Sequence, residues 1–303
     1  MLPSVNVFDL SFDEDKLIRW LMKIGVLHNG QTCTAGYLGV QCGVNMYLES
    51  FTRCLDGLIW RCSVKKCRAT RSIRLDSYFQ GCHISIAKIV LIMHCYLKYA
   101  RMPQKYIADM ACVSENIVVG WCSRIRKAIS QYFELNPLVL GKHHPVQIDE
   151  SLFGGKSKYR RGGHARHTQV WVFGIIEENT KLCYMCTVDD RKQKTLLPII
   201  SRRVHAGATI KSDEWSSYKI LGECGFVHLT VNHSVGFVKD RVHTQLVESL
   251  WSQVKSIIRL KRGIRASHLQ GYLDYYSFMR LAMYLNVPFC ELFLRLIQIK
   301  NPI

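Results

Sequence analysis

The feature that most constrains the fold is the order of extended and helical segments between residues 145 and 287. Runs rich in β-branched and aromatic residues predict strands, whereas apolar residues at helical spacing predict helices. The predicted strands are Val146–Phe153, Val170–Ile176, Leu182–Val188, Ala208–Ser212 and Phe226–Asn232, and the predicted helices are Thr195–Val204, a segment around Glu248, and His268–Tyr284. Three successive strands followed by a crossover predict an α/β fold, with a mixed sheet flanked by helices.

The segment Val242–Lys255 predicts an amphipathic helix for which Thr244 suits the N-cap. Its apolar stripe comprises Val247, Leu250, Trp251, Val254 and Ile258. Glu248 lies beside that stripe, and Lys255 follows two turns later on the same side. A carboxylate at the margin of a buried face is costly unless a metal ion or a basic side chain meets it. From this helix alone, an ordinary surface glutamate is the alternative.

Two upstream aspartates strengthen the case for a shared site. Asp149 interrupts a predicted strand, where aspartate is depleted, and Asp213 follows another strand at its carboxyl end, where α/β sheets bind ligands. If the two strands are neighbours, both aspartates and Glu248 can meet at one edge. Three converging carboxylates repel, and hard cations such as Mg²⁺ or Mn²⁺ relieve that repulsion. Two such ions would suit phosphodiester chemistry. Local salt bridges at strand ends are the alternative.

The charge balance points to a polyanionic partner. The chain has 41 basic and 23 acidic residues, a net charge of +18, so nucleic acid is the first candidate and an anionic membrane surface the second. No apolar run of about 18 residues occurs, and no membrane-spanning helix is expected. Thirteen cysteines without a recognisable secretory signal predict a reducing compartment rather than a disulfide framework.

Four cysteines near the N-terminus suggest a small zinc ribbon: Cys33, Cys42, Cys62 and Cys67. The spacing is poor, because only the pair Cys62 and Cys67 approaches the usual separation, and Gly39 stands where a partner of Cys42 is expected. The first pair is therefore interpreted as degraded. A metal-free remnant and an ordinary cysteine-containing hairpin remain alternatives to zinc.

Two further regions are candidates for DNA contacts. Helices at Pro103–Met110 and Ser114–Ile129, around a turn at residues 111–113, predict a helix-turn-helix, although plain helical bundles contain similar pairs. The second helix carries Arg124, Arg126 and Lys127, and a basic loop after the first strand of the sheet carries Lys156, Lys158, Arg160 and Arg161.

The predicted domains are a lead-in helix (1–32), a zinc-ribbon-like unit (33–80), a helical helix-turn-helix region (81–140), a catalytic domain (145–287) and a tail (288–303). Pro137, Gly141 and Pro145 mark the main boundary.

A series of motifs then carries a family resemblance. In order, the chain contains Ile148-Asp149-Glu150-Ser151-Leu152-Phe153-Gly154-Gly155-Lys156, Val188-Asp189-Asp190-Arg191, Ser212-Asp213-Glu214-Trp215-Ser216-Ser217-Tyr218, Val231-Asn232-His233-Ser234 and His243-Thr244-Gln245-Leu246-Val247-Glu248-Ser249-Leu250-Trp251-Ser252-Gln253-Val254-Lys255. The series, from Val146 to Arg280, resembles the DDE transposase domain of the Merlin superfamily and its bacterial insertion-sequence relatives. Upstream, Trp60-Arg61-Cys62, Cys67, Ser72-Ile73-Arg74 and Ser77-Tyr78-Phe79 look like the N-terminal part of that family.

The resemblance implies an RNase H-like catalytic fold and cut-and-paste DNA transposition. It puts Asp149, Asp213 and Glu248 at the ligand positions of two Mg²⁺ or Mn²⁺ ions, and Lys255 at the position of a trailing lysine that steadies a phosphate or the terminal base. Three further motif positions, which orient either the DNA or the carboxylates, are occupied by Asn232, His233 and His243.

It also implies double-stranded DNA partners, both transposon ends and target, and a homo-oligomer on DNA, because two ends must be joined. Location would be nuclear in a eukaryote and cytoplasmic otherwise. The sequence departs from the family pattern at Gln245, where asparagine is more usual, and at the first cysteine pair. A host-adopted, non-catalytic DNA-binding protein is therefore the alternative function, and a purely structural basic protein is a third hypothesis.

Overall fold

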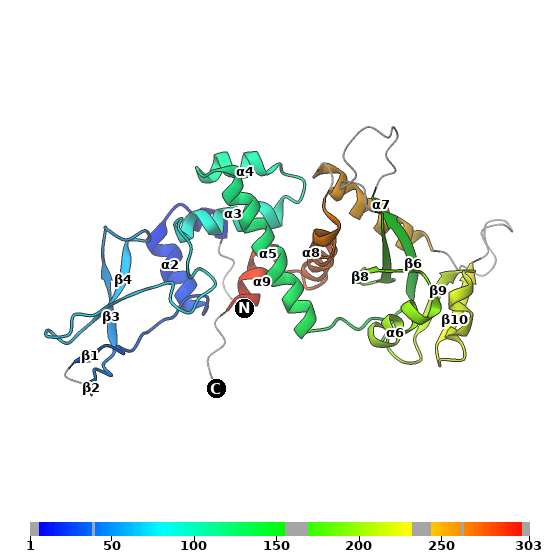
Figure 1. Ribbon diagram of the computed structural model, residues 1–303, viewed down its shortest axis with the longest axis horizontal. Helices are drawn as coiled ribbons and strands as arrows, with labels where there is room; N and C mark the ends of the chain where they lie inside the picture. Colours follow the sequence, from blue (N-terminus) through cyan, green and yellow to red (C-terminus); the bar gives the residue numbers. More distant parts are fainter. Residues whose placement is uncertain (1–5, 38–39, 155–168, 232–243, 262–263, 299–303) are drawn as a thin grey trace. The chain divides into compact units, whose positions relative to one another are not determined.

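The computed structural model describes residues 6–37, 40–154, 169–231, 244–261 and 264–298 (Figure 1). The chain forms two compact units. Unit 1 comprises Met1–Cys122 and Pro288–Ile303, and unit 2 comprises Ser123–Val287. The division falls within one helix, α5 (Glu115–Leu135).

Unit 2 contains the mixed sheet that the sequence predicts. Within the described residues, the sheet has five strands in the order β10-β9-β6-β7-β8. The strands are β6 (Val146–Phe153), β7 (Val170–Glu177), β8 (Cys183–Val188), β9 (Thr209–Asp213) and β10 (Val227–Val231). The neighbours β6, β7 and β8 pair antiparallel, whereas β9 pairs parallel with both β6 and β10. The predicted α/β class and mixed sheet are confirmed.

The connections explain this strand order. A tight turn, in which Lys181 adopts a positive φ of 60°, joins β7 to β8, as an antiparallel hairpin requires. The parallel strand β9 needs a crossover, which α6 (Gln193–Arg203) supplies. Before that helix, Asp190 orders the loop by accepting hydrogen bonds from Lys192 N and from Thr195 Oγ1. The short 3-10 helix η2 (Ser216–Leu221) leads from β9 towards β10.

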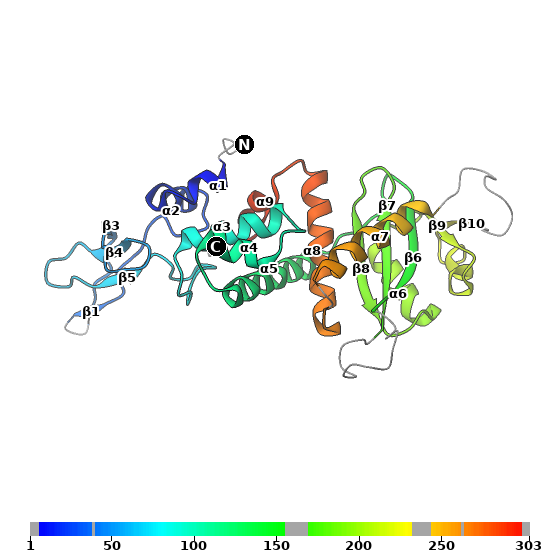
Figure 2. The ribbon, with the colours of Figure 1, turned by 90° about the horizontal axis from the view of Figure 1, so that it is seen from above.

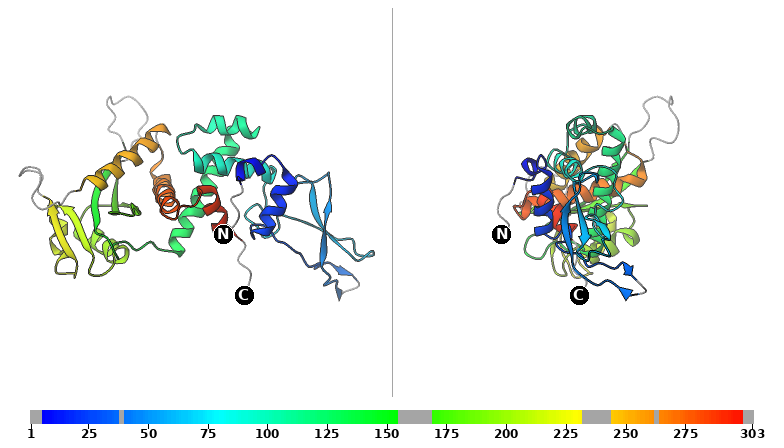
Figure 3. Two further views of the ribbon diagram at one scale, coloured as in Figure 1. Left: turned by 180° about the vertical axis from the view of Figure 1, so that it is seen from behind. Right: turned by 90° about the vertical axis from the view of Figure 1, so that its left-hand side faces the viewer.

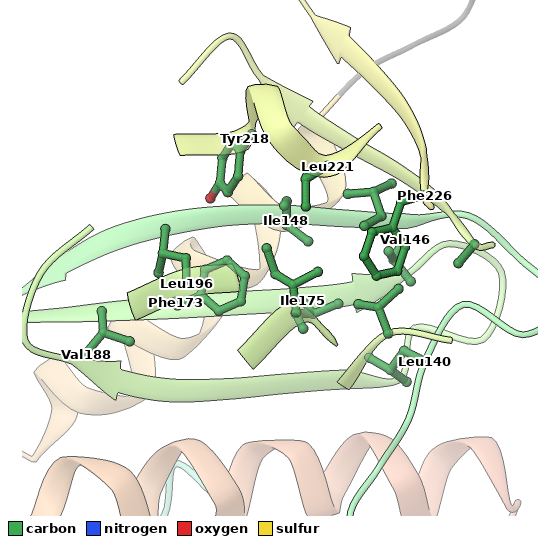
Figure 4. Close-up of a cluster of buried hydrophobic side chains, with 14 of the residues drawn as sticks. Leu140, Val146, Ile148, Phe173, Ile175, Val188, Leu196, Tyr218, Leu221 and Phe226 are labelled. Carbon is green, nitrogen blue, oxygen red and sulfur yellow. The ribbon is translucent and has the colours of Figure 1, made fainter. Parts of the chain in front are cut away.

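Successive side chains of each strand point to opposite faces of the sheet, and each face packs in its own hydrophobic core. On one face, Ile148 and Phe173 pack with Leu196 of α6 and Tyr218 of η2 (Figure 4). On the other face, Phe153 and Val172 pack with α7 (Gln245–Leu260) and α8 (Ala266–Tyr284). Figure 2 shows α7 lying across the strands on this second face. Because Asp149 neighbours Ile148 in β6, its side chain points to the face that α7 covers.

Unit 1 combines helices with small antiparallel sheets (Figure 3). Its described elements are α1 (Val7–Leu10), α2 (Glu14–Lys23), β1 (Gly36–Tyr37), β2 (Val40–Gln41), β3 (Met46–Ser50), β4 (Leu58–Cys62), β5 (Thr70–Ser72), α3 (Ile86–Lys98), α4 (Gln104–Ala111) and α9 (Phe289–Leu296), together with the start of α5. A buried ion pair ties the small sheet to α3: Arg74 donates two hydrogen bonds of 2.6 Å to Asp56, which also accepts from Ile86 N at 3.0 Å.

The helices α4 and α5 correspond to the predicted helix pair, and Cys112 makes the turn between them in a left-handed conformation. The second helix is longer than predicted, because it continues beyond Ile129 to Leu135. Its C-terminal part belongs to unit 2 rather than to the preceding helical region. The proposed helix-turn-helix role and the five-domain division remain predictions.

No described helix combines the length and the hydropathy that crossing a bilayer would require.

Candidate active site

Asp149 and Asp213 lie at the same level on adjacent parallel strands. In the parallel pairing of β6 with β9, Val146 lies beside Ile210 and Gln147 beside Lys211. Continuing it by two residues brings Asp149 beside Asp213, at the carboxyl end of β9. Side chains alternate along strands, so both aspartates point to the sheet face that α7 covers. The sequence-based condition that the two strands be neighbours is therefore met.

The carboxyl group of Asp149 is half-buried and held in a fixed orientation. Trp251 Nε1, on α7, donates a 2.8 Å hydrogen bond to Asp149 Oδ2. Burial raises the pKa of Asp149, the Trp251 hydrogen bond opposes that rise, and the charges of Asp213 and Glu248 raise it further. The charges of Asp213 and Glu248 therefore both act on the Asp149 carboxyl group, as expected for groups of one site.

Glu248 and Lys255 come to this site on α7. Glu248 is exposed, and its Oε1 accepts a 3.3 Å hydrogen bond from Thr244 Oγ1. Lys255 Nζ donates a 2.7 Å hydrogen bond to Ser151 Oγ, two residues beyond Asp149 on β6. Burial lowers the pKa of Lys255, an effect that the charge of Asp149 opposes. All four predicted catalytic side chains thus lie on one face of unit 2.

The donor set of this site suits a hard cation. Carboxylate oxygens are the ligands that Mg²⁺ and Mn²⁺ favour. The carboxylates are less tightly gathered than the N-terminal thiols, because in the described part of the chain only the cysteine cluster has all its potential ligand atoms within 4.8 Å of one another. Their metal-binding role remains a prediction.

Glu150, next to Asp149, belongs to a second polar cluster on the opposite face of the sheet. It accepts a short hydrogen bond from Tyr218 Oη, and Arg191 Nη1 lies 4.0 Å from its Oε2. Burial raises the pKa of Glu150 to about 7, and the Arg191 charge works against that rise. The motifs containing Arg191 and Tyr218 are visible in the sequence, but nothing in their spacing indicates that they meet Glu150.

Arg191 also organises the loop that follows Asp213. Its guanidinium lies between the rings of Trp171 and Trp215, 4.2 Å from each ring centroid. Its carbonyl oxygen accepts hydrogen bonds from Trp215 Nε1 at 3.2 Å and from Ser217 Oγ at 2.8 Å. Trp215 N in turn donates to Asp213 Oδ1 at 3.1 Å. Arg191 therefore helps to orient the Asp213 carboxylate through Trp215.

The predicted DNA-contacting residues have different outcomes. The prediction that Arg126 contacts DNA is corrected, because its side chain is buried within unit 2. Its guanidinium lies 4.2 Å from the ring centroid of Tyr272. Arg124 is half-buried and Lys127 is exposed. The residues Lys156, Lys158, Arg160, Arg161, Asn232, His233 and His243 lie outside the described part of the chain.

The four N-terminal cysteines form a compact cluster in unit 1. Their sulfur atoms all lie within 4.8 Å of one another, with 3.6 Å between Cys33 and Cys67 and 3.5 Å between Cys42 and Cys62. A tetrahedral site with Zn–S bonds near 2.3 Å has sulfur separations of about 3.8 Å. A hydrogen bond from the backbone N–H of Ala69 lowers the pKa of Cys67, whereas burial and neighbouring thiols raise the pKa values of Cys33 and Cys62 against the backbone N–H groups that face them. The cluster is compatible with Zn²⁺.

The poor cysteine spacing has a structural explanation. Between Cys33 and Cys42 the chain makes the antiparallel excursion β1–β2, and Cys42 N donates a 2.9 Å hydrogen bond to Ala35 O. Gly43 N also donates to Cys33 O at 3.0 Å. This excursion returns the chain to its starting point, so the two thiols meet although eight residues separate them. A pair that looks degraded by spacing therefore still contributes both thiols.

Parts of the chain are similar to known proteins. Residues 140–280 match the family model described as the ISXO2-like transposase domain. An uncharacterized transposase-like protein of Haemophilus influenzae is 29% identical over 90 residues, which cover 30% of this chain and 73% of that protein.

Among solved structures, the catalytic core domain of BIV integrase is 13% identical, with a TM-score of 0.33, covering 47% of this chain and 94% of that one. A chain of the simian T-cell lymphotropic virus intasome in complex with PP2A regulatory subunit B56 gamma is 11% identical, with a TM-score of 0.32, covering 61% and 67%. The family-model match and the Haemophilus influenzae relative support a transposase family. The segment matched by the family model, residues 140–280, carries the three carboxylates.

Proposed function

We propose that this protein is a metal-dependent enzyme that cleaves DNA strands and transfers the ends to a target, as in cut-and-paste transposition. One observation carries the proposal: Asp149 and Asp213 lie side by side on adjacent parallel strands, on the sheet face covered by the helix that carries Glu248, within the segment that matches a transposase domain. The proposal includes an RNase H-like fold and a place in the Merlin superfamily. The strand order and the motif series support these finer assignments.

In this proposal the three carboxylates hold two Mg²⁺ or Mn²⁺ ions. When bound, such ions activate a water or a 3′-hydroxyl and stabilise the departing oxygen of a phosphodiester. Trp251 orients Asp149 by donating to Oδ2, and Trp215 orients Asp213 by donating to Oδ1. Lys255 contributes a positive charge beside Asp149, where it can hold a DNA phosphate.

DNA binding rests on the basic surface. The net charge of +18 favours contact with the phosphate backbone. The proposed contacts are Arg124, Lys127, Lys156, Lys158, Arg160, Arg161, Asn232, His233 and His243. Because strand transfer joins two DNA ends, the protein is proposed to act as a homo-oligomer on DNA.

We also propose that Cys33, Cys42, Cys62 and Cys67 hold a structural Zn²⁺ ion. The support is the convergence of four thiols in a unit whose sheet is small. Tetrahedral thiolate coordination stabilises units that have little core of their own.

The test of the enzymatic function uses the full-length chain with supercoiled plasmid and with end-labelled duplex carrying the flanks of its own coding region. We expect nicking that requires Mg²⁺ or Mn²⁺ and that Asp149→Ala abolishes. Glu223→Gln, which changes an exposed carboxylate in a turn, is the matched control and should cleave normally.

The alternative function is that of a host-adopted DNA-binding protein. It predicts salt-sensitive DNA binding by the wild-type protein, with no cleavage in either metal. That outcome would refute the enzymatic proposal. Inverted repeats in the genomic flanks would instead support a mobile element.

A further inference from the structure

Helix α7 is joined to strand β6 by hydrogen bonds at three alternate strand residues. Gln147 Oε1 accepts from Leu246 N at 3.0 Å and from Val247 N at 3.2 Å; Asp149 Oδ2 accepts from Trp251 Nε1 at 2.8 Å; and Ser151 Oγ accepts from Lys255 Nζ at 2.7 Å. We call these contacts the polar ladder. Its strand residues 147, 149 and 151 meet helix residues 247, 251 and 255 in the same order.

The spacing of the polar ladder follows from the geometry of its two elements. Alternate residues of a strand are about 6.6 Å apart. Residues four apart in an α-helix are about 6 Å apart along the axis. The two repeats are of similar length, and the side chains of Gln147, Trp251 and Lys255 bridge the remaining distance between the two elements. A slip of one residue would move the helix by about 1.5 Å, turn it by about 100°, and break every rung.

The first rung replaces a missing helix cap. The first N–H groups of a helix have no partner within it, and Thr244 at the N-cap makes no side-chain capping hydrogen bond. Gln147, which is fully buried, supplies the acceptor instead. Its Nε2 donates to Glu178 Oε1 at 2.8 Å, and Lys211 pairs with the same carboxylate at 2.8 Å. This network fixes which end of the Gln147 amide points towards the helix.

The second rung needs a glycine opposite Asp149. Gly174 of β7 pairs with Asp149, and a Cβ at Gly174 would lie 2.3 Å from Trp251 Cη2. The absence of a side chain there lets the indole ring reach across the sheet to the Asp149 carboxylate.

We propose that Gln147, Trp251 and Ser151 are positioning residues that set the register of α7 against β6. This register holds Glu248, which lies between the first and second rungs, close to Asp149 and Asp213. The inference rests on the proposed function, because it assigns the purpose of the polar ladder to the alignment of the three metal-binding carboxylates.

The test uses Gln147→Met, Trp251→Phe and Ser151→Ala in the full-length chain. Ser249→Ala is the matched control, because Ser249 lies on the exposed side of α7, where its Oγ accepts a 3.1 Å hydrogen bond from Gln253 Nε2. Two measurements do not depend on catalysis: hydrogen exchange of the α7 backbone amides, and Mn²⁺ binding followed by electron paramagnetic resonance. DNA affinity measured without metal shows whether a substitution has disturbed the fold as a whole.

We expect Gln147→Met to speed hydrogen exchange of the Leu246 and Val247 backbone amides by about tenfold, because both amides lose their hydrogen-bond acceptor. Gln147→Met and Trp251→Phe should each raise the half-saturating Mn²⁺ concentration by about tenfold, an amount equivalent to about 1.4 kcal/mol. Ser151→Ala should change the half-saturating Mn²⁺ concentration less than the other two variants do. It should lower the cleavage rate, because Lys255 loses its hydrogen-bond acceptor. Ser249→Ala should match the wild type in every measurement.

Wild-type exchange and wild-type Mn²⁺ binding in Gln147→Met and Trp251→Phe would overturn the inference. If Gln147→Met does not fold, Trp251→Phe decides by the same Mn²⁺ criterion, because it removes one donor and keeps an aromatic ring. Failure of the proposed function looks different: in that case wild-type Mn²⁺ binding would be absent or unchanged by Asp149→Ala.

Discussion

Replacing Gly174 with alanine tests how the sheet, α7 and Asp149 depend on one another. The new Cβ would lie 2.3 Å from Trp251 Cη2 and 2.7 Å from Trp251 Cζ2. Ordinary contact begins at 3.4 Å, so the ring must retreat from 2.3 Å by about 1.1 Å. The protein interior is close-packed, and overfilling of this kind costs about 1–3 kcal/mol of stability.

The same displacement moves the Trp251 N–H away from Asp149. A misplacement of about 1 Å at a catalytic group can lower a rate by roughly 100-fold. We therefore expect Gly174→Ala to lower metal-dependent cleavage far more than it lowers the DNA affinity. Urea unfolding gives the stability change, and single-turnover cleavage of labelled duplex gives the rate.

Gly222→Ala is the matched control. Gly222 lies in the same unit, has no heavy atom within 4 Å of an added Cβ, and has a φ of −62° that alanine adopts without strain. It should unfold and cleave like the wild type. Gly174→Ala with wild-type stability and wild-type cleavage would refute the reasoning, because the indole would then have room that the structure denies it.

Four further predictions concern other parts of the molecule. Asp213→Ala and Glu248→Ala should abolish cleavage while changing DNA affinity in a gel-shift titration by less than threefold, roughly 0.65 kcal/mol; a large loss of affinity would indicate a folding or binding role instead. Arg191→Lys should lower the free energy of unfolding by about 1 kcal/mol, because the guanidinium contacts with two indole rings are lost. It should also raise the half-saturating Mn²⁺ concentration, because the loop that follows Asp213 is loosened. An unchanged Mn²⁺ dependence would contradict a role of Arg191 in orienting Asp213. Cys62→Ser, or chelation of the wild type, should lower the melting temperature of unit 1 and release zinc measurable by a metal-binding dye; an unchanged melting temperature under chelation would count against zinc. Burial raises the pKa of Asp274 above its ordinary value of 3.8. The stability linked to its protonation is therefore present at low pH and lost as pH rises through the folded-state pKa. Asp274→Asn should flatten this part of the profile of unfolding free energy against pH, measured with urea, and parallel profiles for the two proteins would exclude the linkage.

The strand and helix pattern of unit 2 could be predicted because its signals are local. Val146–Phe153 was expected as a strand and is one, and the crossover helix expected at Thr195–Val204 is observed at Gln193–Arg203. Runs of β-branched residues and helical spacing of apolar residues depend only on near neighbours in sequence. The positions of Asp149 and Asp213 followed from those elements, together with the condition that their strands be adjacent.

The contacts that orient the site could not be predicted, because they depend on which elements become neighbours. Gln147 reads as an ordinary polar residue in a strand, yet it caps a helix about 100 residues later. Gly174 reads as a weak point in a strand, yet it makes room for Trp251. Arg191 meets Glu150 and two tryptophans only once the sheet has formed.

Spacing rules failed in two instructive places. The separation of Cys33 and Cys42 suggested a degraded metal site, because such rules assume a short loop and here the chain inserts the β1–β2 excursion. Arg126 was expected on a DNA-facing helix surface, but α5 continues into unit 2, where Tyr272 covers its guanidinium. In both cases, contacts between segments distant in sequence decide where the side chains lie, and local spacing does not predict those contacts.

The most direct test of the account is anomalous diffraction from crystals of the full-length protein soaked in Mn²⁺. The account predicts manganese peaks between the carboxylates of Asp149, Asp213 and Glu248, and their loss in Asp149→Ala crystals. Peaks that lie elsewhere in the wild type, or peaks that persist at full height in Asp149→Ala, would contradict it.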